Sequence, residues 1–139
     1  MTESAPGSPA TESARQRLRD LRRGLLRLHK ILLDLERAWY EQAHGRVSSG
    51  ELLRLAINHE QFAWLHSISE LIVRIDEMLD ADEPLTIGDA ESLVAHARSL
   101  LRPSDTGSEF ERKYFAAIQS EPDVVFAHRE MMRLLSSSA

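Results

Sequence analysis

A chain of 139 residues is long enough for one domain with its own core, and its 42% hydrophobic and 28% charged residues are typical of a folded protein. The formal net charge of −5 argues against nucleic acid as the main partner, and the absence of cysteine excludes disulfides, thiolate metal sites and cysteine nucleophiles. No segment resembles a signal peptide or reaches the roughly 18 apolar residues of a spanning helix, so we expect a cytoplasmic protein.

The first ten residues are rich in Ser, Pro, Gly and Thr, and we expect a disordered tail over residues 1–12. Ser13 and Gln16 have the spacing of a capping box, which predicts a long helix over residues 13–44. Its apolar residues step by three and four in turn, which forms a heptad seam of Leu18, Leu21, Leu25, Leu28, Leu32, Leu35 and Trp39. Apolar neighbours widen this seam, which favours a bundle over a bare coiled coil. A helix of this length spans roughly 45 Å, so part of it is expected to project.

Further helices are predicted from capping signals along the rest of the chain. Ser48 and Glu51 have the spacing of a second capping box. Thr86 and Asp89 are expected to open another helix, and Ser108 and Glu111 to start a short one. Asn58 with Gln61 marks a restart, so residues 48–80 form either one bent helix or a short helix and a longer one. Ser120 is expected to cap a last helix that begins near Pro122. No segment alternates like a strand, so the predicted fold is all-α. It is a bundle of four to six helices around a long N-terminal helix, in one domain over residues 13–139.

Two segments carry a resemblance to other proteins. Residues 58–65 and 107–128 resemble pieces of small uncharacterised bacterial all-helical proteins. The resemblance extends over about half of the chain and implies a bacterial origin. It implies no activity.

The charges are distributed unevenly along the chain. Residues 15–30 contain seven cations and one anion, whereas residues 76–91 contain seven acidic residues and no cation. Four of the cations fall opposite the heptad seam and form what we name the basic stripe: Arg19, Arg23, Arg27 and Lys30. This stripe is predicted either to contact an anionic partner or to be a solvated face balanced by the acidic segment of the same or a neighbouring molecule. A protein partner is favoured over nucleic acid, because no aromatic residues alternate with the arginines.

Metal binding has weak candidates. His66 and Glu70 lie one helical turn apart and could share a metal ion. With His29 or His59 also directed inward, a metal- or ligand-binding bundle remains an alternative. Because these ligand sets are incomplete, the sequence predicts no metal and no cofactor.

A calcium loop is also suggested by spacing alone. Asp80, Asp82 and Glu91 occupy positions 1, 3 and 12 of such a loop. Pro84 stands where a ligand is needed, and Leu85 stands where glycine makes the turn. We therefore expect an acidic loop between helices.

No nucleophile elbow, phosphate-binding loop or kinase signature is present, so no catalytic residue is predicted. Trp64 lies off the apolar face of its helix, and packing is favoured over an exposed anchor for a partner. We expect a non-enzymatic helical bundle that acts through protein–protein contact, with a homodimer as one form. The alternatives are metal or ligand binding through histidine and glutamate, and nucleic-acid binding through the basic stripe.

Overall fold

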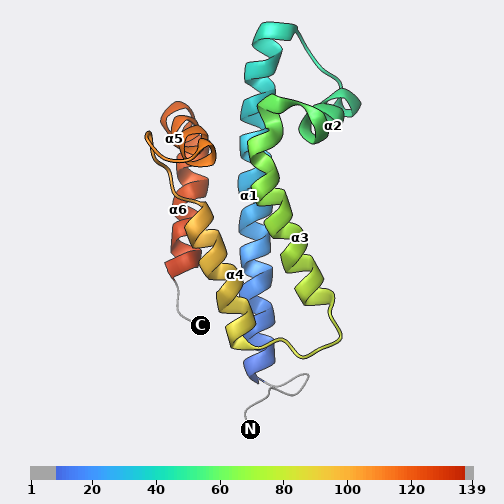
Figure 1. Cartoon of the computed structure of the whole chain (residues 1–139), viewed down its shortest axis with the longest axis vertical. Coiled ribbons are helices and arrows are strands. Elements are labelled where there is room, and N and C mark those ends of the chain that lie inside the picture. Colours follow the sequence, from blue (N-terminus) through green and yellow to red (C-terminus); the bar gives the residue numbers. More distant parts are fainter. Residues whose placement is uncertain (1–8, 137–139) are drawn as a thin grey trace.

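The computed structural model describes residues 9–136, in which every regular element is a helix (Figure 1). The elements in chain order are α1 (Pro9–His44), α2 (Ser49–Asn58), the 3-10 helix η1 (Glu60–Leu65), α3 (His66–Asp80), α4 (Ile87–Leu100), α5 (Glu109–Ser120) and α6 (Pro122–Ser136). The predicted all-α bundle around a long N-terminal helix is confirmed. Over residues 9–136 no helix is both long enough and apolar enough to cross a membrane.

Helix α1 forms the centre of the bundle, and α3, α4 and α6 pack along it (Figure 1). Its buried residues are Thr11, Ala14, Leu18, Leu21, Leu25, Leu28, Leu32 and Glu36. The predicted seam is therefore confirmed as far as Leu32. Beyond it the buried position is Glu36, and Leu35 and Trp39 are half-buried. The reason is geometric: a straight α-helix has 3.6 residues per turn, so its buried face drifts away from a strict heptad.

The start of α1 differs from the prediction. The helix begins at Pro9, a residue type favoured in the first turn, and Ser13 lies inside the helix and does not cap it. Burial of Thr11 and Ala14 explains the extension, because these residues continue the packed face by one further turn. Residues 9–12 are thus helical, and the remainder of the predicted tail, residues 1–8, lies outside the described residues.

The end of α1 agrees with the prediction. The helix stops at His44, and Gly45 follows with a φ of +86°. The Gly45 N–H donates to the carbonyl oxygen of Glu41 at 2.8 Å. This is the left-handed cap in which glycine carries no Cβ penalty.

The helix starts predicted at Ser48, Thr86 and Ser108 are confirmed, and each of them is a capping box. In each box the hydroxyl accepts from the backbone N–H of the acidic residue, whose carboxylate accepts from the backbone N–H of the capping residue. These pairs start α2 at Ser48, α4 at Thr86 and α5 at Ser108.

Two other predicted caps are wrong. Residues 48–80 form separate helices as one alternative predicted, but His59, and not Asn58, caps the restart: its Nδ1 accepts from the Gln61 N–H at 3.0 Å. Ser120 does not cap α6, because it is the last residue of α5 and its hydroxyl donates to the Ala116 carbonyl at 2.7 Å. In both cases a local hydrogen bond between a side chain and the backbone decides the cap, and sequence spacing alone does not predict that bond.

Close contact between α1 and α6 depends on a glycine. A Cβ atom at Gly24 would lie 2.6 Å from the sulfur of Met131 and 2.9 Å from a methyl carbon of Leu134. Without a side chain at this position, α6 approaches the α1 backbone more closely than two ordinary residues allow.

The C-terminal end of α1 projects from the bundle. None of its residues after Glu36 is buried, and in Figure 1 this end extends past the other helices. Helix α2 lies beside the projection and packs against η1. The fold therefore has a well-packed body and a thinner end formed by α1, α2 and η1.

Candidate functional site

The basic stripe is exposed on α1, as predicted from its position opposite the seam. Each of its side chains has a polar partner: Gln16 at 3.3 Å for Arg19, Asp20 at 3.6 Å for Arg23, Glu130 at 2.9 Å for Arg27, and Asp34 at 2.9 Å for Lys30. Exposed pairs of this kind contribute little to stability, but they reduce the field that a ligand would experience. Three of the four positive charges on the stripe lie beside a carboxylate.

Other cations of the basic segment hold α1 against the acidic segment. The contacts are Arg15 to the Leu79 carbonyl at 3.0 Å, Arg17 to Glu91 at 2.9 Å, and Arg22 to Asp76 at 2.5 Å. Arg17 also donates to the Leu134 carbonyl at 2.8 Å, so one guanidinium joins α1, α4 and α6. The opposite charges of the two segments therefore meet within one chain.

The weak metal candidates are not brought together as a ligand set. Nε2 of His66 lies 2.8 Å from the Ala56 carbonyl oxygen and so donates to it, whereas Glu70 is exposed. His59 caps η1, as described above. Over residues 9–136 no group of three histidine or acidic side chains is placed to hold a metal ion.

His29 has a different environment from the other candidates. Its Nε2 lies 3.0 Å from the Ser69 hydroxyl, in a half-buried position between α1 and α3. Burial, and then the nearby His66, lower the pKa of His29 below its ordinary value. The arrangement favours a neutral imidazole that shares a hydrogen bond with Ser69.

The acidic residues near the α3–α4 loop also have other roles. Asp89 accepts from the Thr86 N–H at 3.1 Å in the α4 cap, and Glu91 pairs with Arg17. The calcium spacing therefore does not produce convergent ligands, and the expected acidic loop connects α3 to α4.

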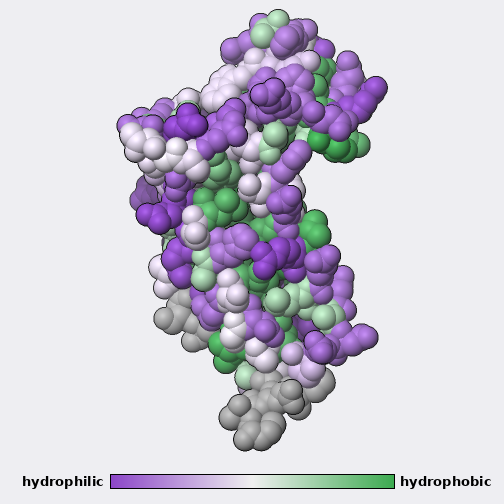
Figure 2. All heavy atoms as spheres, in the orientation of Figure 1, coloured by the Kyte–Doolittle hydropathy of each residue, from purple (hydrophilic) through white to green (hydrophobic). Residues whose placement is uncertain are grey.

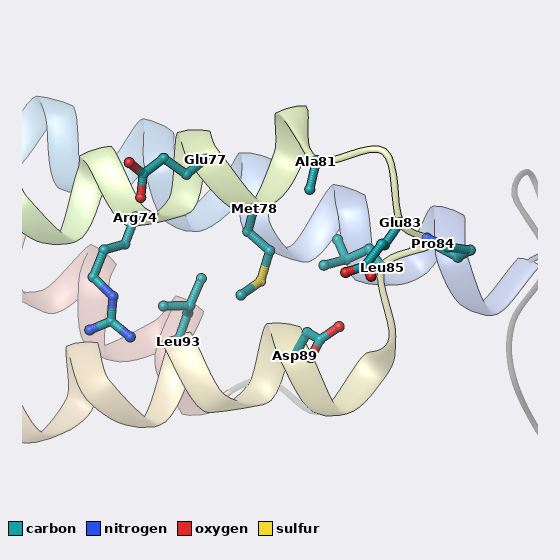
Figure 3. A pocket seen from close by; sticks show the side chains of 9 residues that line it. All are labelled: Arg74, Glu77, Met78, Ala81, Glu83, Pro84, Leu85, Asp89 and Leu93. Carbon is teal, nitrogen blue, oxygen red and sulfur yellow. The ribbon is translucent and has the colours of Figure 1, made fainter.

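A groove of about 370 Å³ lies between α3, α4 and this loop (Figure 3). Figure 3 shows the Glu77 and Asp89 carboxylates on opposite walls, with the Met78 side chain between them. Arg74 is the one cation among residues 9–136 that lines the groove. The Glu77 and Asp89 carboxylates are thus separated by apolar surface.

A buried carboxylate was missed by the sequence analysis. Glu36 accepts hydrogen bonds from Nε1 of Trp64 at 2.9 Å and from Nε2 of Gln61 at 2.8 Å. Glu36 and Trp64 are both buried, which confirms packing as the role of Trp64. The one sequence signal was the position of Glu36, four residues after Leu32.

Aromatic rings continue from Trp64 towards α6. The ring centroids are 5.3 Å apart between Trp64 and Phe110, 5.7 Å between Phe110 and Tyr114, and 5.3 Å between Tyr114 and His128. At the far end the Tyr114 hydroxyl lies 2.7 Å from Nδ1 of His128. Burial raises the pKa of Tyr114 and lowers the pKa of His128. The tyrosine therefore stays un-ionised. Within residues 9–136 its hydroxyl has no other hydrogen-bond partner, so its proton is used only if the hydroxyl donates to Nδ1 of a neutral imidazole.

Helix α2 carries the most exposed apolar surface of the projecting end. None of its residues is buried. Leu53 is 62% exposed and Ile57 is 57% exposed, and the two lie one helical turn apart. We name this pair the α2 face. Figure 2 shows hydrophobic surface on α2, above the notch that separates it from the body of the bundle.

Comparisons with protein-family models, with curated proteins and with solved structures give no match for this chain.

Proposed function

We propose that this protein is a non-enzymatic helical bundle that acts through protein–protein contact, and that two copies associate through the α2 face. The proposal rests on the exposure of α2. This amphipathic helix has no buried residue and lies on the projecting end of the molecule. Neighbouring exposed apolar side chains of this kind are typical of a surface that a partner covers.

The length of α2 supports a partner. A helix of ten residues is marginal in water, and most of its stability has to come from packing of its apolar side. Its inner side packs against η1, with Leu52 and Leu55 half-buried. The outer side presents Leu53 and Ile57 to solvent, and full burial of such a side chain contributes roughly 1.5–3 kcal/mol. Covering the α2 face would therefore stabilise the helix as well as the contact.

The charges around α2 favour a second copy as the partner. A two-fold contact places the same surface on both sides, so the rim needs charges of both signs. Glu51 and Arg54 are exposed on α2 itself, and Arg46 and Glu60 are exposed shortly before and after it in the sequence. Such a rim can complement its own copy, whereas a rim of one sign would repel it.

We also propose the bacterial cytoplasm as the place of this function. The support is the absence of cysteine, which suits a reducing compartment, and the resemblance of two segments to bacterial helical proteins. Fractionation of the source cells with an antibody against the chain would test the location.

Sedimentation velocity tests the self-association. The wild-type protein is expected to sediment faster as its concentration rises to tens of micromolar. The variant Leu53→Glu/Ile57→Glu is expected to remain monomeric, because two buried carboxylates would oppose the contact. The control is Val73→Glu/Phe126→Glu, whose positions are 53% and 62% exposed, on α3 and α6.

Circular dichroism of each variant checks that the helices are intact. The proposal requires that the control associates as the wild type does. It is wrong if the wild type is strictly monomeric over this range, or if the control loses association as fully as the α2 variant.

A further inference from the structure

A groove of about 570 Å³ lies between the C-terminal end of α4 and α6. Its charged or titratable lining residues are Arg98, Arg102 and His128, and among residues 9–136 no acidic side chain lines it. Apolar side chains, Met132 and Pro103 among them, form much of the remaining wall. The groove thus combines positive charge with apolar surface.

Two other grooves make the contrast clear. In the groove of Figure 3, Arg74 lies with the carboxylates of Glu77, Glu83 and Asp89. In the groove between α1 and α6, three arginines are accompanied by two carboxylates, and the lining includes Arg23, Arg27, Arg133, Asp20 and Glu130. As far as the described part of the chain shows, the α4–α6 groove is the one of these three whose cations have no acidic neighbour in the lining.

Both arginines of the groove retain donors for a ligand. Within residues 9–136 the Arg102 side chain has no hydrogen bond or ion pair, and it is exposed. Arg98 donates to the Leu135 carbonyl, which uses part of a guanidinium that has five N–H donors. A carboxylate or phosphate group accepts such donors in pairs, with geometry that suits the guanidinium plane.

His128 is held in a defined orientation by a buried partner. Its Nδ1 accepts from the Tyr114 hydroxyl at 2.7 Å, and Tyr114 is fully buried. The proton of the neutral imidazole is therefore on Nε2, across the ring from this hydrogen bond. Within residues 9–136 no group accepts from Nε2, so this N–H is a third donor at the groove.

We propose that the α4–α6 groove binds a small organic anion. Arg98, Arg102 and Nε2 of His128 hold its carboxylate or phosphate group, and its apolar body lies against Met132 and Pro103. Carbonyls at the C-terminal end of α4 oppose an anion, but as a partial charge they are outweighed by two full positive charges. The site does not depend on the proposed dimer, because α6 and α2 lie on opposite sides of α1 (Figure 1).

The test is a titration of the ¹⁵N-labelled full chain, followed by amide chemical shifts. The probes are phenylacetate and phenyl phosphate, with neutral phenylacetamide and inorganic phosphate as comparisons. At least one aromatic anion is expected to cause saturable shifts around Arg102, His128 and Met132. Saturation by phenylacetate alone identifies a carboxylate ligand, and saturation by phenyl phosphate alone identifies a phosphate ester.

Matched variants connect the shifts to the donors. Arg102→Ala is expected to weaken binding at least about fivefold, because a charge-assisted pair is lost. His128→Asn keeps an acceptor for Tyr114 while removing the Nε2 donor, so it is also expected to weaken binding. Arg129→Ala is the control, since Arg129 is adjacent in sequence but lines a different groove, beside Phe126.

Four results would overturn the proposal. The first is that neither aromatic anion gives saturable shifts. The second is that phenylacetamide produces the same shifts, which would mean that charge has no role. The third is that inorganic phosphate binds as tightly as phenyl phosphate, which would remove the role of the apolar wall. The fourth is that Arg129→Ala weakens binding as much as Arg102→Ala does.

Discussion

The indole Nε1 of Trp64 donates to the buried carboxylate of Glu36 at 2.9 Å. This hydrogen bond lies where the packed face of α1 departs from its heptad, so a polar contact replaces the next leucine of the seam. Gln61 supplies a second donor to the same carboxylate, and also donates to the Glu36 backbone carbonyl at 3.2 Å. Together these bonds hold η1 against α1.

Replacement of Glu36 by alanine is expected to lower the free energy of unfolding by about 2–4 kcal/mol, because the buried indole N–H of Trp64 and the half-buried amide of Gln61 lose their acceptor. Glu36→Gln keeps one acceptor oxygen and is expected to cost less, about 1 kcal/mol. Urea unfolding followed by circular dichroism measures both values. The control is Asp34→Ala, which removes an exposed partner of Lys30 and is expected to cost under about 0.5 kcal/mol. Equal stability of Glu36→Ala and Asp34→Ala would contradict the account.

Stability is expected to fall as the pH is lowered from 7 towards 5. Burial lowers the pKa of His29 and His128 below the ordinary 6.5. Well above pH 6.5 both states hold neutral imidazoles, and the stabilisation is fully present. As the pH falls below 6.5, the unfolded chain binds protons first, so the free energy of unfolding decreases until the native pKa is passed.

Urea unfolding at pH 7 and pH 5 measures this decrease. His29→Gln/His128→Gln is expected to show a smaller decrease, and His44→Gln, at an exposed position, is the control. A hydrogen bond from the backbone N–H of Val47 is the main cause of the lowered pKa of Glu41. The stabilisation that this carboxylate contributes is therefore lost only as the pH falls below 4.5, outside the measured range. An unchanged decrease in the double variant would show that other groups cause it.

Two arginines of α1 are expected to differ in their effect on stability. The Arg17 side chain is 12% exposed and bonds both Glu91 and the Leu134 carbonyl. The Arg27 side chain is 63% exposed and pairs with Glu130. We expect Arg17→Met to cost about 1–3 kcal/mol and Arg27→Met to cost under about 0.5 kcal/mol. Thermal or urea unfolding of the two variants in parallel measures the difference. Similar losses of stability in the two variants would mean that the burial of Arg17 does not strengthen its hydrogen bonds.

The fold was predictable because its signals are local. The leucines from Leu18 to Leu32 lie on one face at fixed spacing, and each capping box is complete within four residues. The prediction failed at three local caps, Ser13, Asn58 and Ser120, and also where a partner comes from far along the chain. Glu36 is buried because Trp64 and Gln61 reach it from more than twenty residues away, and no periodicity in α1 signals those donors.

The candidate site was predictable to a similar extent. The exposed position of the basic stripe followed from the helical period, but the partner of Arg27 is Glu130 of α6, which depends on tertiary packing. The exposure of Leu53 was not predicted, because an apolar residue in an amphipathic helix is normally buried. Leu53 is exposed because α2 lies outside the body of the bundle.

The most direct test of the central claim is the distance between two α2 helices in solution. Because the chain has no cysteine, Asn58→Cys provides a single site for a nitroxide label at the end of α2 and leaves the charges around the α2 face intact. Packed helices lie about 8–10 Å apart, so pulsed electron paramagnetic resonance is expected to give a label-to-label distance below roughly 30 Å. Absence of any dipolar interaction at tens of micromolar, or a distance above roughly 50 Å, would contradict association through the α2 face.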